Sequence, residues 1–319
     1  MKYLRQLGDL GSVPGPTHLA IGVFDGIHLG HQAVIGRAVR SARQTGGSAV
    51  VVTFDPHPVR VLRPERAPRL LTAPSQKGRL IEELGVDAIL TIAFTREFSE
   101  TSPELFIQAL HRYANDLREI CVGEDWRFGA NRSGEVRVLQ TIAGRCGITI
   151  SALSPVLVGD RAVSSTRVRL ALDRGDLYEA SLLLGRPFSL CGIVGEASPL
   201  TGQMEIAADS ADASAHQFPP VGMYAVKALR GGKEYRGAVN ISWAQARQEH
   251  ERLLQLHILS PSRQISGEEI ELTLLQYLRP PSTSGGFGQQ IARDALWAKE
   301  IYDMESRVEE GIEFCELDF

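Results

Sequence analysis

Two histidines stand three residues apart in a glycine-rich segment that could bind the phosphates of a nucleotide. The segment reads GVFDGIHLGH from Gly22 to His31, with His28 and His31 at its end. Its glycines permit positive φ angles and a close approach of the backbone to phosphate, and a helix starting near His31 would offer free N–H groups. Both histidines could then face one anion. The segment predicts a triphosphate site, and the alternative is a tight turn with a capping histidine.

Two further segments could hold the rest of a small ligand. The first is TFDPHP, residues 53–58, where proline cannot continue a strand and the rigid turn presents Asp55 and His57. The second is GEDWRFGANRSG, residues 123–134, whose aromatic side chains could stack on a planar ring while acidic and backbone groups fix its edges. A strand-ending turn and an exposed loop with a structural tryptophan are the alternatives.

A fourth segment, SSTRVR over residues 164–169, combines hydroxyls with arginines. Hydroxyls at a helix start cap the helix and can also donate to phosphate, while arginine suits bidentate contacts with oxyanions. Because Arg167 and Arg169 are two residues apart, they cannot share one helix face. We therefore expect one of them at phosphate and the other in structural ion pairs; the alternative is that both are structural.

The elements that must position these segments alternate between strand and helix in the first half of the chain. Short apolar or β-branched runs predict strands, and 3.6-residue spacing predicts helices. This alternation predicts a doubly wound, Rossmann-like parallel sheet of the α/β class, which binds ligands at its carboxyl edge. The expected strands are residues 18–23, 48–54, 88–93, 119–122 and 148–153, and the expected helices are 34–42, 75–84, 102–117, 138–146, 164–174 and 177–184.

The pattern changes after the Gly-Arg-Pro at residues 185–187 to short alternating strands, which predict an all-β domain. Two domains result, residues 1–186 and residues 187–319. A stretch rich in Ala, Ser and Asp, residues 207–220, predicts a mobile loop, and residues 288–308 predict a closing helix. The expected strands are residues 188–194, 222–229, 233–241, 253–259 and 269–278.

The composition of the chain indicates which kinds of ligand and partner it can bind. The 319 residues carry a net charge of −4, which gives no general basic field for nucleic acid, and no apolar run approaches the roughly 20 residues that span a bilayer. Four scattered cysteines, without a CxxC pair, argue against a zinc site and a disulfide framework. We expect a cytoplasmic protein that acts on small molecules and binds neither nucleic acid nor membrane. The cysteines are Cys121, Cys146, Cys191 and Cys315.

Together these segments resemble the bacterial bifunctional riboflavin kinase/FMN adenylyltransferases, also called FAD synthetases, over residues 15–190. The resemblance implies that the FMN phosphate attacks the α-phosphorus of ATP directly, giving FAD and pyrophosphate without a covalent enzyme intermediate. The residues that carry it are GVFDGIHLGH (22–31), TFDPHP (53–58), LTAPSQKGRLIEELGVD (71–87), FTREFSETSPELF (94–106), GEDWRFGANRSG (123–134) and SSTRVR (164–169).

The resemblance also implies roles for individual residues. The catalytic residues would be His28, His31, Ser164 and Arg169. ATP would be bound by Gly22, Phe24, Asp25, Gly30, Ser165 and Thr166, and the flavin by Asp55, Pro56, His57, Pro58, Asp125 and Phe128. Mg²⁺ would accompany ATP, but the sequence assigns it no protein ligand. FMN and FAD are then substrate and product, and a homo-oligomer is left open.

The second half resembles the riboflavin kinase β-barrel of the same family in its framework only. Where the family has a segment ending Gly-Phe-Pro-Thr-Ala-Asn, this chain has residues 201–209, TGQMEIAAD. Gln255 stands two residues before His257, where the family has its catalytic glutamate, and a carboxamide cannot act as a base. The family's Asn-Ile-Gly-x-x-Pro-Thr is reduced to residues 240–242, NIS. The framework segments are GRPFSLCGIV (185–194), PPVGMYAV (219–226), YRGAVNIS (235–242), LHIL (256–259), YLRP (277–280) and QQIARDALWA (289–298).

These departures predict an FMN adenylyltransferase that has lost riboflavin kinase activity, its barrel persisting as a support, an oligomerisation surface or a degenerate flavin site. One alternative is a fully bifunctional enzyme with an unrecognised nucleotide site around residues 195–220. Another is a non-catalytic sensor of flavin or nucleotide. The intact histidine and SSTRVR segments argue against the sensor, because binding alone does not require groups specific to the transition state.

Overall fold

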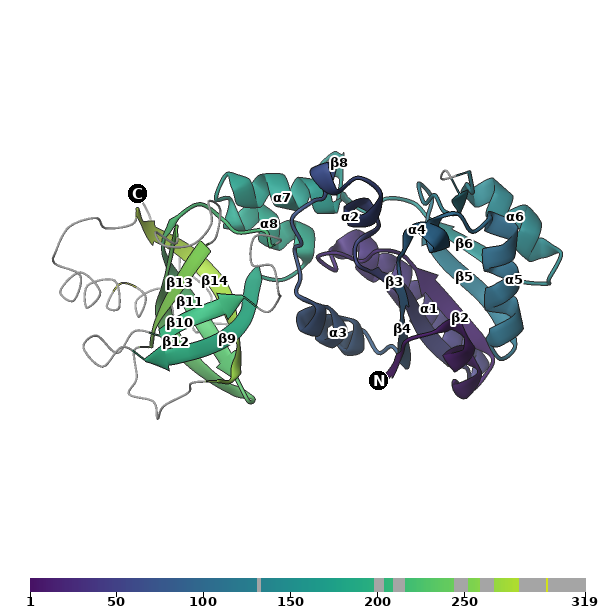
Figure 1. Cartoon of the computed structure of the whole chain (residues 1–319), viewed down its shortest axis with the longest axis horizontal. Helices are drawn as coiled ribbons and strands as arrows, with labels where there is room; N and C mark the ends of the chain where they lie inside the picture. The colour runs from purple at the N-terminus through teal and green to yellow at the C-terminus, as the bar shows by residue number, and fades with distance from the viewer. Residues whose placement is uncertain are drawn as a thin grey trace, which may run out of the picture. The chain divides into compact units, whose positions relative to one another are not determined.

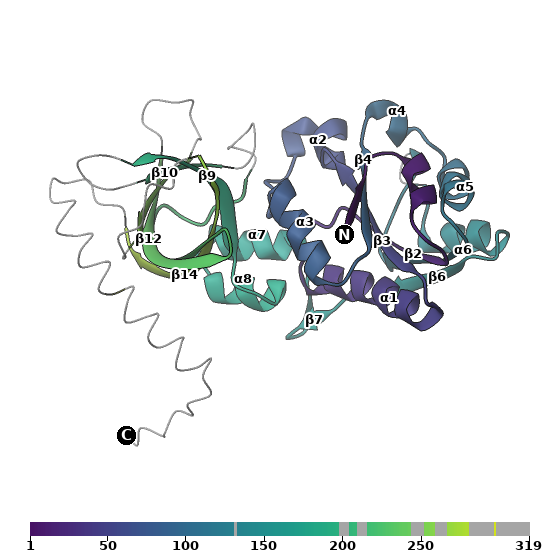
Figure 2. The same ribbon diagram turned by 90° about the horizontal axis from the view of Figure 1, so that it is seen from below.

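The computed structural model describes residues 1–130, 133–197, 204–208, 216–243, 252–258, 267–280 and residue 297. The chain divides into two compact units, drawn in Figure 1 and, turned by 90°, in Figure 2. The first unit comprises Met1–Arg167 and Leu183–Gly185, and the second comprises Val168–Leu182 and Arg186–Phe319. The division therefore falls inside two helices, α7 (Ser165–Asp173) and α8 (Leu177–Leu184).

The first unit is built on a six-stranded sheet in the order β1-β4-β3-β2-β5-β6, and every neighbouring pair is parallel. The strand order reverses around β2, so the loops after β2, β3 and β5 all leave the carboxyl edge of the central strands. The strands are β1 (Lys2–Leu4), β2 (Thr17–Ile21), β3 (Ser48–Asp55), β4 (Ala88–Ala93), β5 (Leu117–Gly123) and β6 (Thr149–Leu153).

Helices cover both faces of this sheet, as the alternation of strand and helix predicts. Successive strand residues point to opposite faces: Leu19 and Ile21 pack with α5 and α6, whereas Ala20 packs with α1 and α3. Figure 2 shows these two pairs of helices on opposite sides. The helices are α1 (Leu29–Thr45), α2 (Pro58–Leu62), α3 (Pro74–Glu83), α4 (Arg96–Ser99), α5 (Pro103–Tyr113) and α6 (Val136–Gly144), with the short 3₁₀ turns η1 (Leu7–Ser12) and η2 (Pro64–Arg66) and the hairpin β7 (Leu157–Val158) and β8 (Arg161–Ala162).

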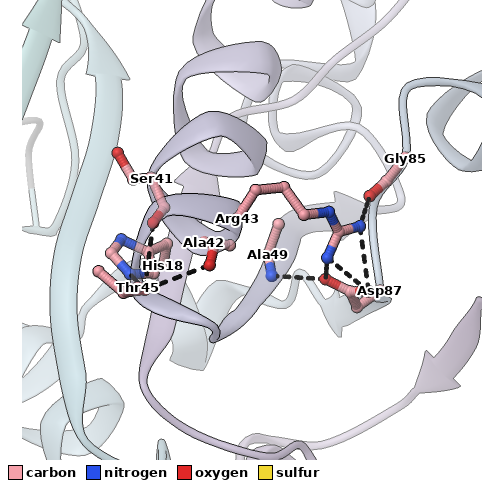
Figure 3. Close-up of polar contacts among 8 residues, drawn as sticks. All are labelled: His18, Ser41, Ala42, Arg43, Thr45, Ala49, Gly85 and Asp87. Atoms are coloured by element: carbon pink, nitrogen blue, oxygen red, sulfur yellow. Dashed lines mark hydrogen bonds and ion pairs between the residues drawn. The ribbon is translucent and has the colours of Figure 1, made fainter.

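A buried polar cluster joins α1 to the amino-terminal end of the sheet. His18 on β2 has Nδ1 3.1 Å from Glu119 Oε2 and Nε2 2.9 Å from Thr45 Oγ1. Arg37 and Ser151 also bond to the Glu119 carboxylate, at 3.0 and 2.5 Å. Figure 3 shows Thr45 between His18 and the last carbonyls of α1, and beside them the exposed Arg43, which bonds to Asp87 and to the Gly85 carbonyl.

The second unit contains a closed antiparallel barrel in the order β10-β13-β12-β11-β14-β9, as the family resemblance implies. Met223, Ala225, Ala238 and Leu278 form part of its core, and the buried Tyr224 donates from its hydroxyl to Pro220 O at 2.6 Å. The strands are β9 (Ser189–Ala197), β10 (Met204–Ala208), β11 (Gly222–Arg230), β12 (Lys233–Trp243), β13 (Arg252–Ile258) and β14 (Glu269–Arg279).

The structure corrects two of the predicted segments, the helix over 102–117 and the loop over 207–220. The helix expected over 102–117 ends at Tyr113, because Ala114 is extended and Asp116 has a φ of 46° before β5 begins. The mobile loop expected over 207–220 is wrong at both ends: 207–208 belong to β10, and residues 216–218 are buried. Residues 209–215 and the closing helix over 288–308, apart from Trp297, lie outside the described residues. None of the described helices combines the length and apolarity needed to cross a bilayer.

Candidate active site

The turn between β2 and α1 is held in an unusual backbone conformation. Phe24, Gly26 and Ile27 have φ angles of 50°, 89° and 43°, and for the two non-glycine residues such angles cost free energy that the surrounding contacts must offset. Phe24 and Ile27 are both fully buried, and the Val23 carbonyl accepts a hydrogen bond of 3.0 Å from Thr53 Oγ1 on β3. The turn is therefore a fixed part of the carboxyl edge.

The two histidines form one stacked unit at the start of α1. His28 is the N-cap of this helix, and its Nδ1 accepts from the His31 N–H at 3.3 Å. The two rings lie 3.6 Å apart between centroids with an interplanar angle of 18°, and the Phe24 ring meets His31 edge-on. A Cβ on Gly30 would lie only 3.1 Å from the His28 ring. The histidine pair thus stands where free helix N–H groups favour an anion.

Asp25 ties the turn to two distant parts of the chain. Its buried Oδ1 accepts from the N–H groups of Leu71 and Thr72, at 2.9 and 3.2 Å, and from Thr72 Oγ1 at 3.3 Å. Its main-chain carbonyl accepts from Ser165 Oγ at 2.9 Å. The carboxylate expected to bind ATP is therefore also the group that holds the turn in place.

The SSTRVR segment contributes its first hydroxyls to this edge. Ser165 reaches Asp25 as described, and Ser164 Oγ accepts from the Arg167 N–H at 3.2 Å. Arg167 donates from Nη1 to the carbonyls of Val158 and Arg161, at 3.1 and 3.0 Å, and so fastens the β7–β8 hairpin. Thr166 is exposed. Arg169 falls in the second compact unit.

The loop after β3 presents its polar groups at the end of the strand. Asp55 and Pro56 are exposed, and His57 is the N-cap of α2, with its Nδ1 accepting from the Val59 N–H at 3.2 Å. Pro58 occupies the first position of that helix, where a missing N–H costs nothing. Asp55 is thus the acid that this loop leaves at the surface, next to the turn from β2 because β2 and β3 are neighbours.

The loop after β5 differs from the expected arrangement. Phe128 is only 8% exposed and stacks on Trp126, with centroids 4.3 Å apart and planes at 13°, while Phe106 of α5 packs nearby. Little of the Phe128 ring is therefore open to a ligand, because it completes the core under α5. Asp125, two residues after Gly123, is exposed at the same edge.

One residue at this carboxyl edge, Lys77, was not predicted from the sequence. Lys77 on α3 donates from Nζ to the Val23 carbonyl at 3.1 Å. Burial lowers the pKa of Lys77, and the charges of Asp25 and Asp55 oppose that shift. Lys77 lies within the segment that resembles the family, yet one lysine in an amphipathic helix carries no local signal, and its approach to Val23 depends entirely on the tertiary fold.

In the barrel, Gln255 stands where the family resemblance implies a catalytic glutamate. Asn240 on β12 pairs with Gln255 on β13, and Asn240 Nδ2 donates to Gln255 Oε1 at 3.1 Å. His257, on the same strand, is buried. The carboxamide oxygen of Gln255 therefore already accepts a hydrogen bond from a neighbouring side chain.

The fold and the site define a two-domain protein in which an α/β domain of the nucleotide-binding type, with a histidine pair at the carboxyl edge of its sheet, precedes a closed β-barrel. The FAD synthetase family model matches residues 12–167, and the riboflavin kinase model matches residues 184–302.

Whole-chain relatives agree with these matches. The bifunctional riboflavin kinase/FMN adenylyltransferase of Escherichia coli K12 is 30% identical over 309 residues, covering 95% of this chain and 99% of the relative. That of Listeria monocytogenes is 34% identical over 287 residues, covering 86% and 88%. The chain belongs to the bifunctional riboflavin kinase/FMN adenylyltransferase family.

A solved structure shares the fold. The crystal structure of a macrolide-efflux protein from Streptococcus pneumoniae superposes with a TM-score of 0.77 at 22% identity, covering 94% of this chain and 98% of that one. At this identity the likeness concerns the fold alone.

Proposed function

We propose that this chain makes FAD by transferring AMP from ATP to FMN with release of pyrophosphate, and that it does not phosphorylate riboflavin. The observation that carries the proposal is the stacked pair of His28 and His31 at the start of α1, fixed beside the first hydroxyls of α7. Family membership supplies the two substrates.

The proposed reaction needs positioning and charge stabilisation more than proton transfer. An oxygen of the FMN phosphate, already anionic at neutral pH, forms a bond to the α-phosphorus while the bond to the bridging oxygen of the β-phosphate breaks. The leaving pyrophosphate takes the electron pair, so no base is required. His28 and His31 would donate to the triphosphate as this charge develops, with Ser164 and Arg169 on the pyrophosphate side.

The remaining carried-over residues would frame the two substrates. Asp25 acts through the turn that it holds, while the missing Cβ atoms of Gly22 and Gly30 leave room for the rings of Phe24 and His28. Asp55, His57 and Asp125 would line the flavin side, since the loops after β3 and β5 leave the same edge.

Mg²⁺ would enter with ATP and neutralise part of the phosphate charge when bound. Among the described residues, no three side chains of His, Cys, Asp or Glu gather into a metal-binding group. As a small hard cation, Mg²⁺ usually takes most of its ligands from substrate phosphate oxygens and water. The described cysteines are all free thiols, which suits a reducing cytoplasm.

Loss of riboflavin kinase activity is the first expected result. Gln255 cannot take a proton from riboflavin, and its oxygen already accepts from Asn240. With ATP and Mg²⁺, we expect riboflavin to give FMN at less than roughly 1% of the rate at which FMN gives FAD. Chromatographic separation of the flavins measures both rates in one preparation, so FMN turnover serves as the internal control. Comparable rates would instead establish the fully bifunctional enzyme.

A further inference from the structure

Lys77 places a positive charge between the two proposed substrate loops. Its helix, α3, begins at Pro74, and its Nζ reaches across to the carbonyl of Val23 in the turn that leads to the histidines. The same carbonyl accepts from Thr53 Oγ1 on β3. Because β2 and β3 are adjacent and parallel, the ammonium lies at the carboxyl edge where both loops begin.

The ammonium retains hydrogen-bonding capacity. A lysine carries three N–H donors, and within the part of the chain that the structure describes, Val23 O is the only acceptor of Lys77. Asp25 and Asp55 act on it through charge, yet neither comes within ion-pair distance; Asp25 Oδ1 is already engaged by Leu71 and Thr72. Two donors of a partly buried cation are therefore available to an anion.

The chemistry of the two proposed substrates indicates which anion the Lys77 ammonium can bind. Adenine, the riboses, the ribityl chain and the flavin ring are neutral near pH 7, so phosphate oxygens are the only negative charges that either substrate brings. Charge-assisted bonds from a cation to phosphate are stronger than neutral ones. Removal of the cation would leave the negative charges of Asp25 and Asp55 facing the incoming phosphate.

We propose that Lys77 is a substrate-contacting residue whose ammonium binds a phosphate oxygen, and this inference rests on the proposed function. The phosphate belongs either to FMN or to ATP. For each of these, a ligand with phosphate is compared with one that lacks it. FMN against riboflavin isolates the flavin phosphate, and the unreactive α,β-methylene ATP against adenosine isolates the nucleotide phosphates.

The test is calorimetric titration of the full chain, wild type and Lys77→Met, with these four ligands. We expect the variant to lose about 10- to 100-fold in affinity for FMN or for α,β-methylene ATP, whichever phosphate the lysine contacts, with riboflavin and adenosine within about twofold. The barrel is unchanged between the two proteins, so flavin bound there cancels from the comparison.

Three further variants exclude a purely structural role. Lys77→Gln keeps a donor for Val23 O without the charge and should lose as much phosphate affinity as Lys77→Met, whereas Lys77→Arg should retain most of it. Lys2→Met is the matched control, because Lys2 also donates to a main-chain carbonyl, Ser12 O at 3.0 Å, but at the start of β1. If Lys77→Met fails to fold, Lys77→Gln and Lys77→Arg supply the comparison.

The inference would be overturned if phosphorylated ligands bound Lys77→Met and Lys77→Gln as tightly as wild type, or if ligands with and without phosphate lost equal affinity. Rescue by glutamine would likewise assign Lys77 a structural role. FAD formation by the wild type is measured in parallel. If wild type makes no FAD, the proposed function fails whatever the variants do; if it does, only the role of Lys77 is in question.

Discussion

Replacing His31 by alanine is expected to lower kcat for FAD formation by about 10²- to 10³-fold, while the Kd for ATP changes by less than about threefold. The imidazole would act on charge that develops as pyrophosphate leaves, so its loss should be felt in the transition state far more than in the ground state. Steady-state kinetics at saturating FMN and ATP measure the first quantity, and titration with α,β-methylene ATP measures the second.

The structure sharpens this experiment. The His31 ring stacks on His28 and meets Phe24 edge-on, so alanine also removes support from both neighbours. His31→Phe keeps the stacking without the nitrogens and should lose turnover to a similar degree. His111→Ala is the matched control, because His111 is exposed at the end of α5. Equal and small losses of turnover and affinity in His31→Ala would favour the non-catalytic sensor.

Glu119→Gln is expected to destabilise the chain by about 3 kcal/mol and to lower the Tm of the first unit by about 6–12 °C. The substitution removes a buried negative charge on which His18 and Arg37 converge, and it leaves their positive or polar groups without a matched acceptor. Differential scanning calorimetry measures the change. Glu82→Gln is the control, since Glu82 pairs with the amino terminus at 2.8 Å but is 52% exposed, and such pairs contribute at most about 1 kcal/mol.

The effect of Glu119→Gln should depend on pH in a defined direction. Burial raises the pKa of Glu119, but hydrogen bonds from Ser151, Ser41, His18 and Arg37 outweigh it and bring the pKa from 4.5 down to about 2. A carboxyl whose pKa is lower in the folded state stabilises the fold above its ordinary pKa and loses that contribution as the pH falls. The difference in free energy of unfolding between wild type and Glu119→Gln should therefore reach its maximum above about pH 5 and shrink toward pH 2. A difference that grows with acid would contradict this account.

Local patterns were enough to place the histidine turn. Continuous β-branched runs such as 48–54 identify buried parallel strands, and a glycine-rich segment between a strand and a helix identifies the ligand edge, because both signals depend on neighbours in sequence. The strand β1 was missed, since three residues are too few for a periodic signal and its formation depends on pairing with β4.

Contacts between distant segments could not be read in the same way. Lys77 bonds to Val23, 54 residues away, and Ser165 bonds to the Asp25 carbonyl, 140 residues away. No pattern in the local sequence predicts either bond. Phe128 looks like a ligand-facing aromatic in a polar loop, yet the fold uses it to cover the core beneath α5. Residue type alone cannot separate these two uses of an aromatic ring.

The bonds from Leu71 and Thr72 to Asp25 have a consequence for hydrogen exchange. Amides outside helices and strands usually exchange with solvent deuterium quickly, but these two donate to a carboxylate that is only 2% exposed. Their exchange therefore requires the turn before α1 to open. Mass spectrometry of the peptide around residue 71 would report how often the turn that carries the histidines releases these two amides, with neither substrate nor turnover involved.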